Sequence, residues 1–221
     1  MAVSEVLVGG IDEAGRGSLV GPLVIAGVSV RSSNLKILQD SNVRDSKVLL
    51  PSTRRRLYDL IMSVAEKVSV VEVQPKEIDP YVKYGKKLHK LNYLEAVKMA
   101  KIVDELGAQV VYIDSPDVRP ERLESDILSL SNVKPKVVAR HHADQDYVVV
   151  SAASIVAKVT RDRRIGELAE RYGFFGSGYP ADPRTMAFVK NWMETKGTLP
   201  DFVRGSWKSL KKIQSKKLDE F

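Results

Sequence analysis

Two adjacent carboxylates, Asp12 and Glu13, lie near the start of the chain, between an apolar segment and a glycine-rich turn. The apolar residues before and after the turn predict two strands. The turn consists of Gly15, Arg16 and Gly17. Its glycines let backbone N–H groups approach an anion, and its guanidinium suits a phosphate. The pattern predicts a metal ion beside a phosphate, and a plain acidic β-turn is the alternative.

The two carboxylates cannot both point straight into one site from a regular strand, because successive side chains face opposite sides. Asp12 and Glu13 reach one site together if the backbone twists or if one contributes its carbonyl oxygen. Asp114 ends a further apolar segment, which Ser115 and Pro116 interrupt. Ligands collect at the carboxyl ends of strands in open α/β sheets. Asp114 is therefore a candidate site residue, with a helix cap or turn former as the alternative.

Strand and helix patterns alternate along the chain, which predicts an α/β fold. Its mixed sheet is expected to have antiparallel first strands and a parallel continuation, flanked by helices. Ser52 is the expected cap of the first helix, and Gly107 is expected just after the end of the second. Strands are expected at residues 6–11, 23–30, 68–73, 109–114 and 136–140, helices at residues 52–67, 88–106, 120–130, 147–172, 186–196 and 206–217, and loops at residues 32–50 and 75–85.

Composition sets wide limits on the partners and the location of the protein. The 221 residues are 43% hydrophobic, with no cysteine and a net charge of +7. Any metal must therefore be bound by oxygen or histidine. The basic charge favours a polyanionic partner such as nucleic acid, although many basic proteins bind none. We expect no membrane span and no secretion signal, and hence a cytoplasmic location.

Five segments together resemble a known family. They are GIDEAGRGSLVGPLVIAGV at residues 10–28, RDSKVL at 44–49, YIDSPD at 112–117, HHADQDYVVVSAASIVAKVTRD at 141–162 and GSGYPADP at 176–183. The first is similar to the N-terminal signature of the type 2 ribonucleases H, specifically archaeal ribonuclease HII. The resemblance spans nearly the whole chain. It implies a ribonuclease H-like core over residues 1–172 and a small helical C-terminal extension over residues 173–221.

The resemblance also implies an activity and a cofactor. The family cleaves the RNA strand of RNA–DNA hybrids and cuts duplex DNA 5′ of single embedded ribonucleotides, leaving 5′-phosphate and 3′-hydroxyl ends, in ribonucleotide removal and RNA primer removal. The implied catalytic and metal-binding residues are Asp12, Glu13, Asp114 and Asp144. Without the resemblance, Asp144 would be an acidic residue at the start of a helix. Four carboxylates suit two Mg²⁺ or Mn²⁺ ions about 4 Å apart. Their mutual repulsion predicts a raised pKa for at least one carboxyl in the absence of metal.

Substrate contacts are implied for three further parts of the chain. By resemblance, Gly15, Arg16 and Gly17 contact the ribonucleotide and the junction phosphate, and backbone groups of such a turn can approach a 2′-hydroxyl closely. Tyr179 matches the tyrosine that packs against the following deoxyribose, and Lys47 is an expected phosphate contact. A plain packing aromatic and a solvated loop lysine are the alternatives.

The long helix after Asp144 carries basic residues three apart. Lys158, Arg161 and Arg164 are expected on one face, where they either bind backbone phosphates or form a solvated charged surface. The small residues 151–154 are expected to pack close to another backbone. His141 and His142 adjoin Asp144, so one of them is a candidate to assist leaving-group departure.

The C-terminal segment predicts a basic amphipathic helix that binds a duplex or a protein partner. Its lysines are Lys208, Lys211, Lys212, Lys216 and Lys217. Gln214, Leu218 and Phe221 only weakly approximate a motif that binds the sliding clamp in some relatives. A monomer is expected.

Two other classes of protein remain as alternatives to a ribonuclease H. A basic nucleic-acid-binding protein would have structural acids, yet a pure binder has no reason to place acids where phosphates lie. A DNA-cutting nuclease of the same fold would use the acids but leave the turn and Tyr179 unexplained.

Overall fold

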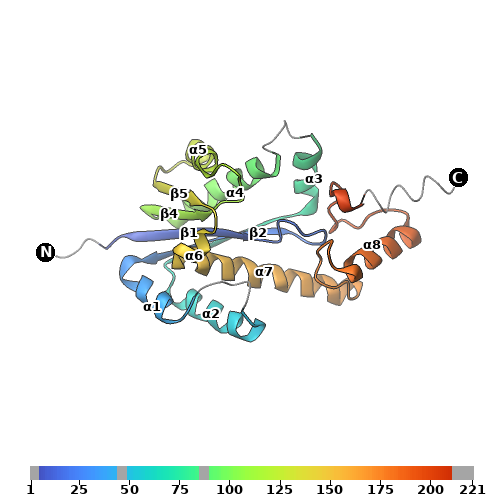
Figure 1. Cartoon of the computed structure of the whole chain (residues 1–221), viewed down its shortest axis with the longest axis horizontal. Coiled ribbons are helices and arrows are strands. Elements are labelled where there is room, and N and C mark those ends of the chain that lie inside the picture. The colour runs from blue at the N-terminus through green and yellow to red at the C-terminus, as the bar shows by residue number, and fades with distance from the viewer. Residues whose placement is uncertain (1–4, 44–48, 85–89, 211–221) are drawn as a thin grey trace. The chain divides into compact units, whose positions relative to one another are not determined.

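A computed structural model describes residues 5–43, 49–84 and 90–210 of the chain (Figure 1). Within them a five-stranded mixed sheet has the order β3-β2-β1-β4-β5. Strand β1 (Leu7–Ala14) pairs antiparallel with β2 (Leu23–Arg31) and parallel with β4 (Val110–Asp114). Strand β5 (Lys136–Arg140) pairs parallel with β4, and β3 (Lys67–Val73) lies at the other edge. The predicted mixed sheet is confirmed, with β1 in its centre.

Helices cover both faces of this sheet, and the glycines of β1 show which helix lies on which face. A Cβ at Gly9 would lie 3.2 Å from Leu106 of α4 (Lys90–Leu106). A Cβ at Gly10 would lie 2.4 Å from the backbone of Val149 in α7 (Val148–Tyr172). Strand β2 is buried at eight of its nine residues, as expected for a strand covered on both faces.

The close approach of α7 to β1 explains the small residues at the start of this helix. Ser151, Ala152, Ala153 and Ser154 are all buried, which confirms the packing role predicted for them. Ala152 and Ala153 share a core with apolar residues of β2 and with Leu57 and Ile61 of α2 (Pro51–Val64). The helix can come this close because Gly10 has no side chain.

The chain divides into two compact units. One contains Met1–Ala14, Val24–Glu72 and Asn92–Thr160, and the other contains Gly15–Leu23, Val73–Leu91 and Arg161–Phe221. The second unit contains the glycine turn, the segment after β3 and the end of α7 as well as residues 173–221, and the expected domain boundary after residue 172 stays a prediction. It has its own apolar core around Leu19, Phe175 and Val189.

Most elements agree with the sequence prediction, and two loops do not. Helix α5 (Pro120–Leu130) has the predicted bounds, and α4 ends before Gly107, whose φ is +63°. The loop expected at residues 75–85 is instead helix α3 (Pro75–Tyr84), with Pro80 inside it. The loop expected at residues 32–50 contains the 3-10 helix η1 (Ser32–Asn34) and α1 (Leu35–Asp40).

Helix termini were the least accurate part of the prediction. Helix α2 begins at Pro51, and Leu50 rather than Ser52 is its N-cap, because proline suits the first helical turn. Helix α8 (Pro183–Lys196) begins three residues earlier than expected, where the Asp182 side chain accepts a hydrogen bond from the Arg184 N–H. Of the helix expected at residues 206–217, residues 208–210 are helical and 211–217 lie outside the described residues. No helix in the described part of the chain is long and apolar enough to span a membrane.

Candidate functional site

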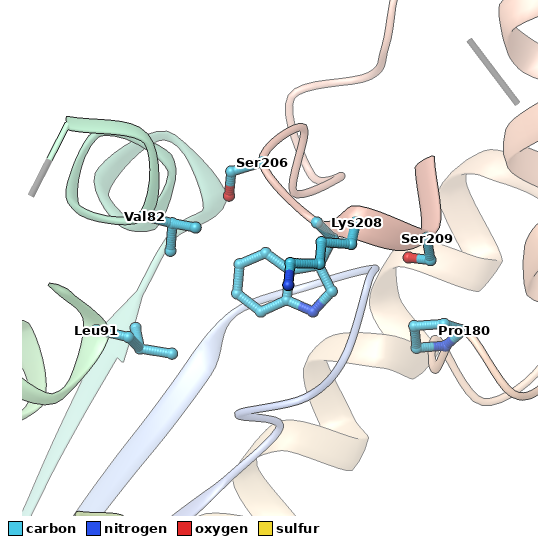
Figure 2. Close-up of a pocket in the computed structure, with 7 residues that line it drawn as sticks. Val82, Leu91, Pro180, Ser206, Lys208 and Ser209 are labelled. Atoms are coloured by element: carbon cyan, nitrogen blue, oxygen red, sulfur yellow. The ribbon is translucent and has the colours of Figure 1, made fainter. Parts of the chain in front are cut away.

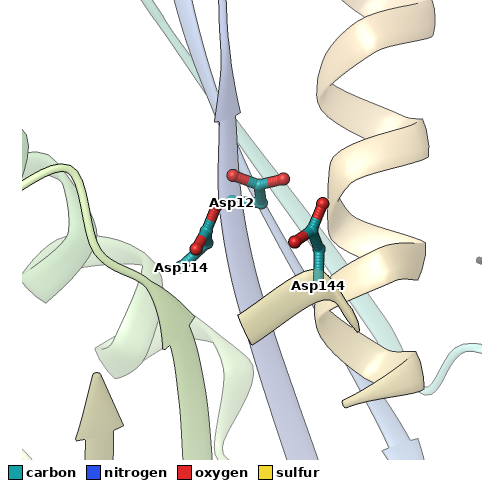
Figure 3. A group of neighbouring side chains, drawn as sticks. All are labelled: Asp12, Asp114 and Asp144. Carbon is teal, nitrogen blue, oxygen red and sulfur yellow. The ribbon is translucent and has the colours of Figure 1, made fainter. Parts of the chain in front are cut away.

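Three aspartates from three separate elements meet at one edge of the sheet (Figure 3). Asp12 lies in β1, Asp114 ends β4, and Asp144 lies in the short helix α6 (Ala143–Asp146). Each offers one carboxylate oxygen, and the three oxygens all lie within 4.8 Å of one another. The parallel pairing of β1 with β4 places Ile11 opposite Ile113, so the aspartates that follow these two residues are neighbours.

Helix α6 brings the third aspartate to this edge through a tight connection after β5. His142, just before the helix, has the left-handed φ of +57°. The Ala143 N–H donates to Asp114 Oδ1 at 3.1 Å, so one carboxylate of the cluster also fixes the start of α6. The Ser151 hydroxyl donates to the carbonyl of Asp144, which ties α6 to α7.

Asp12 is the most strongly perturbed member of the cluster. Only 4% of it is exposed. Burial, with repulsion from Asp114 and a smaller contribution from Asp144, raises the pKa of Asp12 from 3.8 to about 7. Hydrogen bonds from Ser154 and from the Glu13 N–H, which lies 2.7 Å from Asp12 Oδ1, oppose this rise. The raised pKa predicted for one carboxyl of the cluster in the absence of metal is confirmed.

The donor set fits a hard divalent cation. It consists of carboxylate oxygens alone, which are the ligands that Mg²⁺ and Mn²⁺ prefer. A cation would replace the repulsion among the three carboxylates by attraction and would compete with the proton on Asp12. These aspartates are therefore the residues that can bind metal here.

Glu13 is not a member of this three-residue cluster. Strand β1 continues through Asp12 and Glu13 to Ala14 in regular register with β2, so the two neighbouring side chains alternate between faces. The role of Glu13 as a metal ligand stays a prediction. Ser154 was not predicted as a site residue, yet it bonds to Asp12. Its only sequence signal is its place among the small residues in the first two turns of α7.

The predicted glycine turn belongs to the second compact unit. Gly15 is buried with a φ of +83°, and a Cβ there would lie 2.9 Å from the Pro22 carbonyl. The Ser18 N–H and hydroxyl both donate to the Gly15 carbonyl, at 3.2 and 2.8 Å. Gly17 is exposed, and a Cβ there would meet nothing within 4 Å. The fold thus requires glycine at position 15 and leaves open space at position 17.

Two predicted substrate segments lie together within this second unit. The N–H groups of Leu19 and Val20 donate to the Gly178 carbonyl at 2.8 and 3.0 Å, so the residues after the glycine turn are bonded to the loop that carries Tyr179. The Arg161 guanidinium lies over the Tyr179 ring and donates to the Ser177 carbonyl at 2.7 Å. Leu19 and Gly178 lie 159 residues apart in the sequence, so no local pattern indicated the hydrogen bond between them.

The expected basic face of α7 is not a uniform exposed surface. Arg161 is only 2% exposed, so in this structure it faces the protein rather than a duplex. Arg164 pairs with Glu167 at 2.7 Å, and Lys158 is half-buried. His141 and His142 are exposed.

Two further expectations fall partly or wholly outside the described residues. Lys47 lies there, as does most of the predicted C-terminal basic helix, including Lys211, Lys212, Lys216 and Lys217.

The second unit also contains a hollow of about 460 Å³ lined by Val82, Leu91, Pro180, Ser206, Trp207, Lys208 and Ser209 (Figure 2). Among these described lining residues none is a carboxylate, so the metal chemistry belongs to the aspartate cluster.

The fold and the cluster define a metal-dependent nuclease of the ribonuclease H class. The family model for ribonuclease HII matches residues 9–210. The chain belongs to the ribonuclease HII family and is a nuclease with ribonuclease H activity, as the sequence resemblance predicted.

Individual relatives support this assignment over nearly the whole chain. Ribonuclease HII of Caldivirga maquilingensis is 47% identical, covering 99% of this chain and 100% of the relative. That of Pyrococcus abyssi is 44% identical, covering 95% and 92%. The crystal structure of ribonuclease H2 from Pyrococcus horikoshii has a TM-score of 0.87 at 42% identity, covering 95% of this chain and 98% of that one.

Two further structures add detail about relatives. The Archaeoglobus fulgidus ribonuclease HII was solved as a complex with PCNA, with a TM-score of 0.82, 39% identity, and coverage of 92% of this chain and 96% of that one. Bst ribonuclease HIII in complex with Mn²⁺ is 20% identical with a TM-score of 0.79, covering 95% and 70%. The second likeness shows the fold alone.

Proposed function

We propose that the protein hydrolyses the RNA strand of RNA–DNA hybrids and cuts duplex DNA on the 5′ side of single embedded ribonucleotides. The cut leaves 5′-phosphate and 3′-hydroxyl ends. The observation that carries the proposal is the convergence of three carboxylate oxygens within 4.8 Å at the edge of a ribonuclease H-like sheet. Membership of the ribonuclease HII family supports the choice of substrate.

Asp12, Asp114 and Asp144 are the proposed metal ligands, with Glu13 completing the set for two Mg²⁺ or Mn²⁺ ions. When bound, the two ions supply an activated water and stabilise charge on the attacking and leaving oxygens. Asp12 is held in place by its bonds to Ser154 and the Glu13 N–H. Asp114 fixes α6 and with it Asp144. The carboxylates serve as ligands, so no side chain of the cluster is needed as a separate general base.

We assign recognition of the ribonucleotide to the glycine turn and to Tyr179. The open space at Gly17 leaves room for a ribose to approach the backbone, and a 2′-hydroxyl can both accept and donate a hydrogen bond there. The Tyr179 ring, supported from one side by Arg161, is proposed to pack against the next deoxyribose. Lys47 and Lys158 are proposed phosphate contacts.

The same family membership supports a proposal for the cellular setting of the reaction. We propose a cytoplasmic monomer that acts in ribonucleotide removal and RNA primer removal. The relative solved with PCNA supports a contact with a sliding clamp. Retention of the full chain on immobilised clamp protein, lost after deletion of residues 211–221, would test this contact.

The first experiment uses a labelled DNA duplex with one ribonucleotide, incubated with Mg²⁺ or Mn²⁺. We expect a cut 5′ of the ribonucleotide, no cut in an all-DNA duplex, and loss of the cut in Asp12→Asn. Asp146→Asn is the matched control, because Asp146 is an exposed aspartate of the same short helix as Asp144 and lies outside the cluster. Binding without cutting would leave only a nucleic-acid-binding protein, and equal cutting of all-DNA duplex would indicate a DNA nuclease of the same fold.

A further inference from the structure

Arg204 is fully buried, and its guanidinium lies among carbonyl groups of the glycine turn and the residues after it. Its Nη1 donates to the Arg16 carbonyl at 2.7 Å, and its Nη2 donates to the Gly15 carbonyl at 2.7 Å. It also bonds to the Gly21 carbonyl, from Nε at 3.3 Å and from Nη2 at 3.2 Å. One side chain therefore spans both ends of the loop that contains the turn.

These bonds fix the direction of two consecutive peptide groups. In a trans peptide the C=O of one residue and the N–H of the next point in opposite directions. The carbonyls of Gly15 and Arg16 point toward Arg204, so the N–H groups of Arg16 and Gly17 point away from it. Gly17 is exposed, with open space at its Cβ position, so the outward side of this peptide pair is accessible to a ligand.

The charge of Arg204 favours the same arrangement. A buried guanidinium is costly unless its N–H groups are hydrogen-bonded, and the carbonyl oxygens of three residues serve that purpose here. Those bonds polarise the peptide groups and strengthen their outward N–H donors. The positive charge behind the turn further favours a hydroxyl or a phosphate oxygen on its outer side.

Arg204 is itself held firmly within the second unit. Its guanidinium carbon lies 4.8 Å from the centre of the Trp207 ring. The backbone N–H of Arg204 donates to the Leu19 carbonyl at 2.9 Å. The next two residues are bonded to Asp79 of α3, which accepts from the Gly205 N–H at 2.9 Å and from the Ser206 hydroxyl at 2.6 Å. These contacts hold the planar Arg204 guanidinium in place before any substrate binds.

We propose that Arg204 is a positioning residue for ribose recognition, which holds the Gly15–Gly17 backbone so that the N–H groups of Arg16 and Gly17 face the 2′-hydroxyl and the adjacent phosphate. The inference rests on the proposed function, because it assigns a support to the same recognition turn. It predicts that the preference for a ribonucleotide depends on a residue that the substrate does not touch.

The test compares Arg204→Lys with the wild type on two duplexes, one all-DNA and one with a single ribonucleotide. Dissociation constants are measured with Ca²⁺ in place of Mg²⁺, and kcat/KM with Mg²⁺. Lysine keeps the charge and loses the planar fork. We expect the preference for the ribonucleotide duplex and kcat/KM to fall by about tenfold to a hundredfold, as for a lost hydrogen bond to a charged group. Affinity for all-DNA duplex and for Mn²⁺ should stay unchanged.

A second variant separates positioning from general loss of stability. Val189→Ala removes apolar volume from the core of the second unit, so it lowers stability without altering the guanidinium contacts, and its ribonucleotide preference should stay at the wild-type value. Added methylguanidinium should partly restore kcat/KM in Arg204→Ala and leave Val189→Ala unaffected.

Two results would overturn the inference, and they are distinguishable. If Arg204→Lys keeps the wild-type preference for the ribonucleotide duplex, the residue is only a structural support. If the wild type itself shows no preference and no cut at the ribonucleotide, the proposed function fails first and the inference fails with it.

Discussion

The guanidinium carbon of Arg161 lies 4.7 Å from the centre of the Tyr179 ring. Both residues were expected to touch the substrate, and the structure shows that one of them supports the other. Arg161 also donates to the Ser177 carbonyl at 2.7 Å, so it holds the loop from which Tyr179 projects. A buried basic residue thereby fixes an aromatic side chain in a loop that has glycine on both sides of Ser177.

The Arg161–Tyr179 pair should therefore behave as one unit in stability measurements. A double-mutant cycle with Arg161→Met, which removes the charge, and Tyr179→Ala should give a coupling free energy of about 0.5–2 kcal/mol, the range of cation–π contacts from exposed to desolvated sites. Urea unfolding of the four proteins measures it. Tyr179→Phe keeps the ring and the stacking, so the cycle with Phe should give a coupling near zero, and a coupling for Phe equal to that for Ala would show that the ring contributes nothing.

Substitutions at the two ends of the glycine turn should have opposite effects. Gly15→Ala places a side chain at a φ of +83° and 2.9 Å from the Pro22 carbonyl, and it should destabilise the protein by about 1–2 kcal/mol. Gly17→Ala meets nothing within 4 Å and has no positive φ, so thermal unfolding should show unchanged or slightly higher stability.

The same Gly17→Ala variant should nevertheless cut poorly. Its methyl group occupies the space through which the ribose is proposed to approach, and we expect kcat/KM on the single-ribonucleotide duplex to fall by about a hundredfold, as for a substrate displaced by about 1 Å. Wild-type kcat/KM in a stably folded Gly17→Ala would show that this space is not used by the substrate.

The pKa of Asp12 predicts an unusual pH dependence for the metal-free protein. Folding raises this pKa from 3.8 to about 7, so the folded state binds more protons than the unfolded state between these values. The contribution of Asp12 to stability is complete below about pH 4 and falls as the pH rises toward 7, by about 1.4 kcal/mol per pH unit. Urea unfolding in EDTA from pH 4 to 8 measures it.

Asp12→Asn should remove most of this slope and make the metal-free protein more stable at pH 8. Mg²⁺ should stabilise the wild type increasingly as the pH rises, because it competes with the Asp12 proton. The control Asp146→Asn changes an exposed carboxylate and should keep the wild-type slope. A slope in Asp12→Asn equal to that of the wild type would assign the pH dependence to other groups.

Gly10 should influence the distances among the three aspartate carboxylates, because its lack of a side chain lets α7 lie close to β1. An alanine Cβ there would lie 2.4 Å from the Val149 backbone, so α7 must shift away from β1, at a cost of about 1–3 kcal/mol for an overpacked contact. Ser154 would move relative to Asp12, and Mn²⁺ binding measured by calorimetry should weaken.

The matched control for this change is Gly166→Ala in the same helix. A Cβ there meets nothing within 4 Å, so alanine should stabilise the helix by roughly 0.5–1 kcal/mol. Unchanged Mn²⁺ affinity in Gly10→Ala would mean that α7 does not define the spacing of the carboxylates.

The elements of the fold that are apolar and periodic were predictable from sequence, and the exceptions have physical causes. Strand β5 and helix α5 agree with their predicted bounds because local pattern and tertiary packing favour the same structure. Helix α3 was missed because Pro80 is normally a sign against a helix interior. Its Ile78 is fully buried, so packing outweighed the local signal there.

For the candidate site, the metal-binding aspartates could be predicted from the sequence, and the residues that hold the glycine turn in place could not. Asp12, Asp114 and Asp144 were found because carboxylates at strand ends and the family resemblance both single them out. Arg204 was missed because nothing near it in sequence indicates the carbonyls of Gly15 and Arg16, which lie almost the whole chain away. Contacts of that range depend on the tertiary fold, which no local pattern encodes.

The sheet order has a consequence for how the protein becomes active during folding. Strand β1 must pair with β4, about a hundred residues later, before Asp12 and Asp114 are neighbours, and such distant pairings form slowly. A growing polypeptide that ends before Asp144 contains the first two aspartates but lacks the third. We therefore expect newly made chains to gain their full affinity for divalent cations only after residue 144 has been made, and cations that bind the three aspartates to stabilise the finished fold.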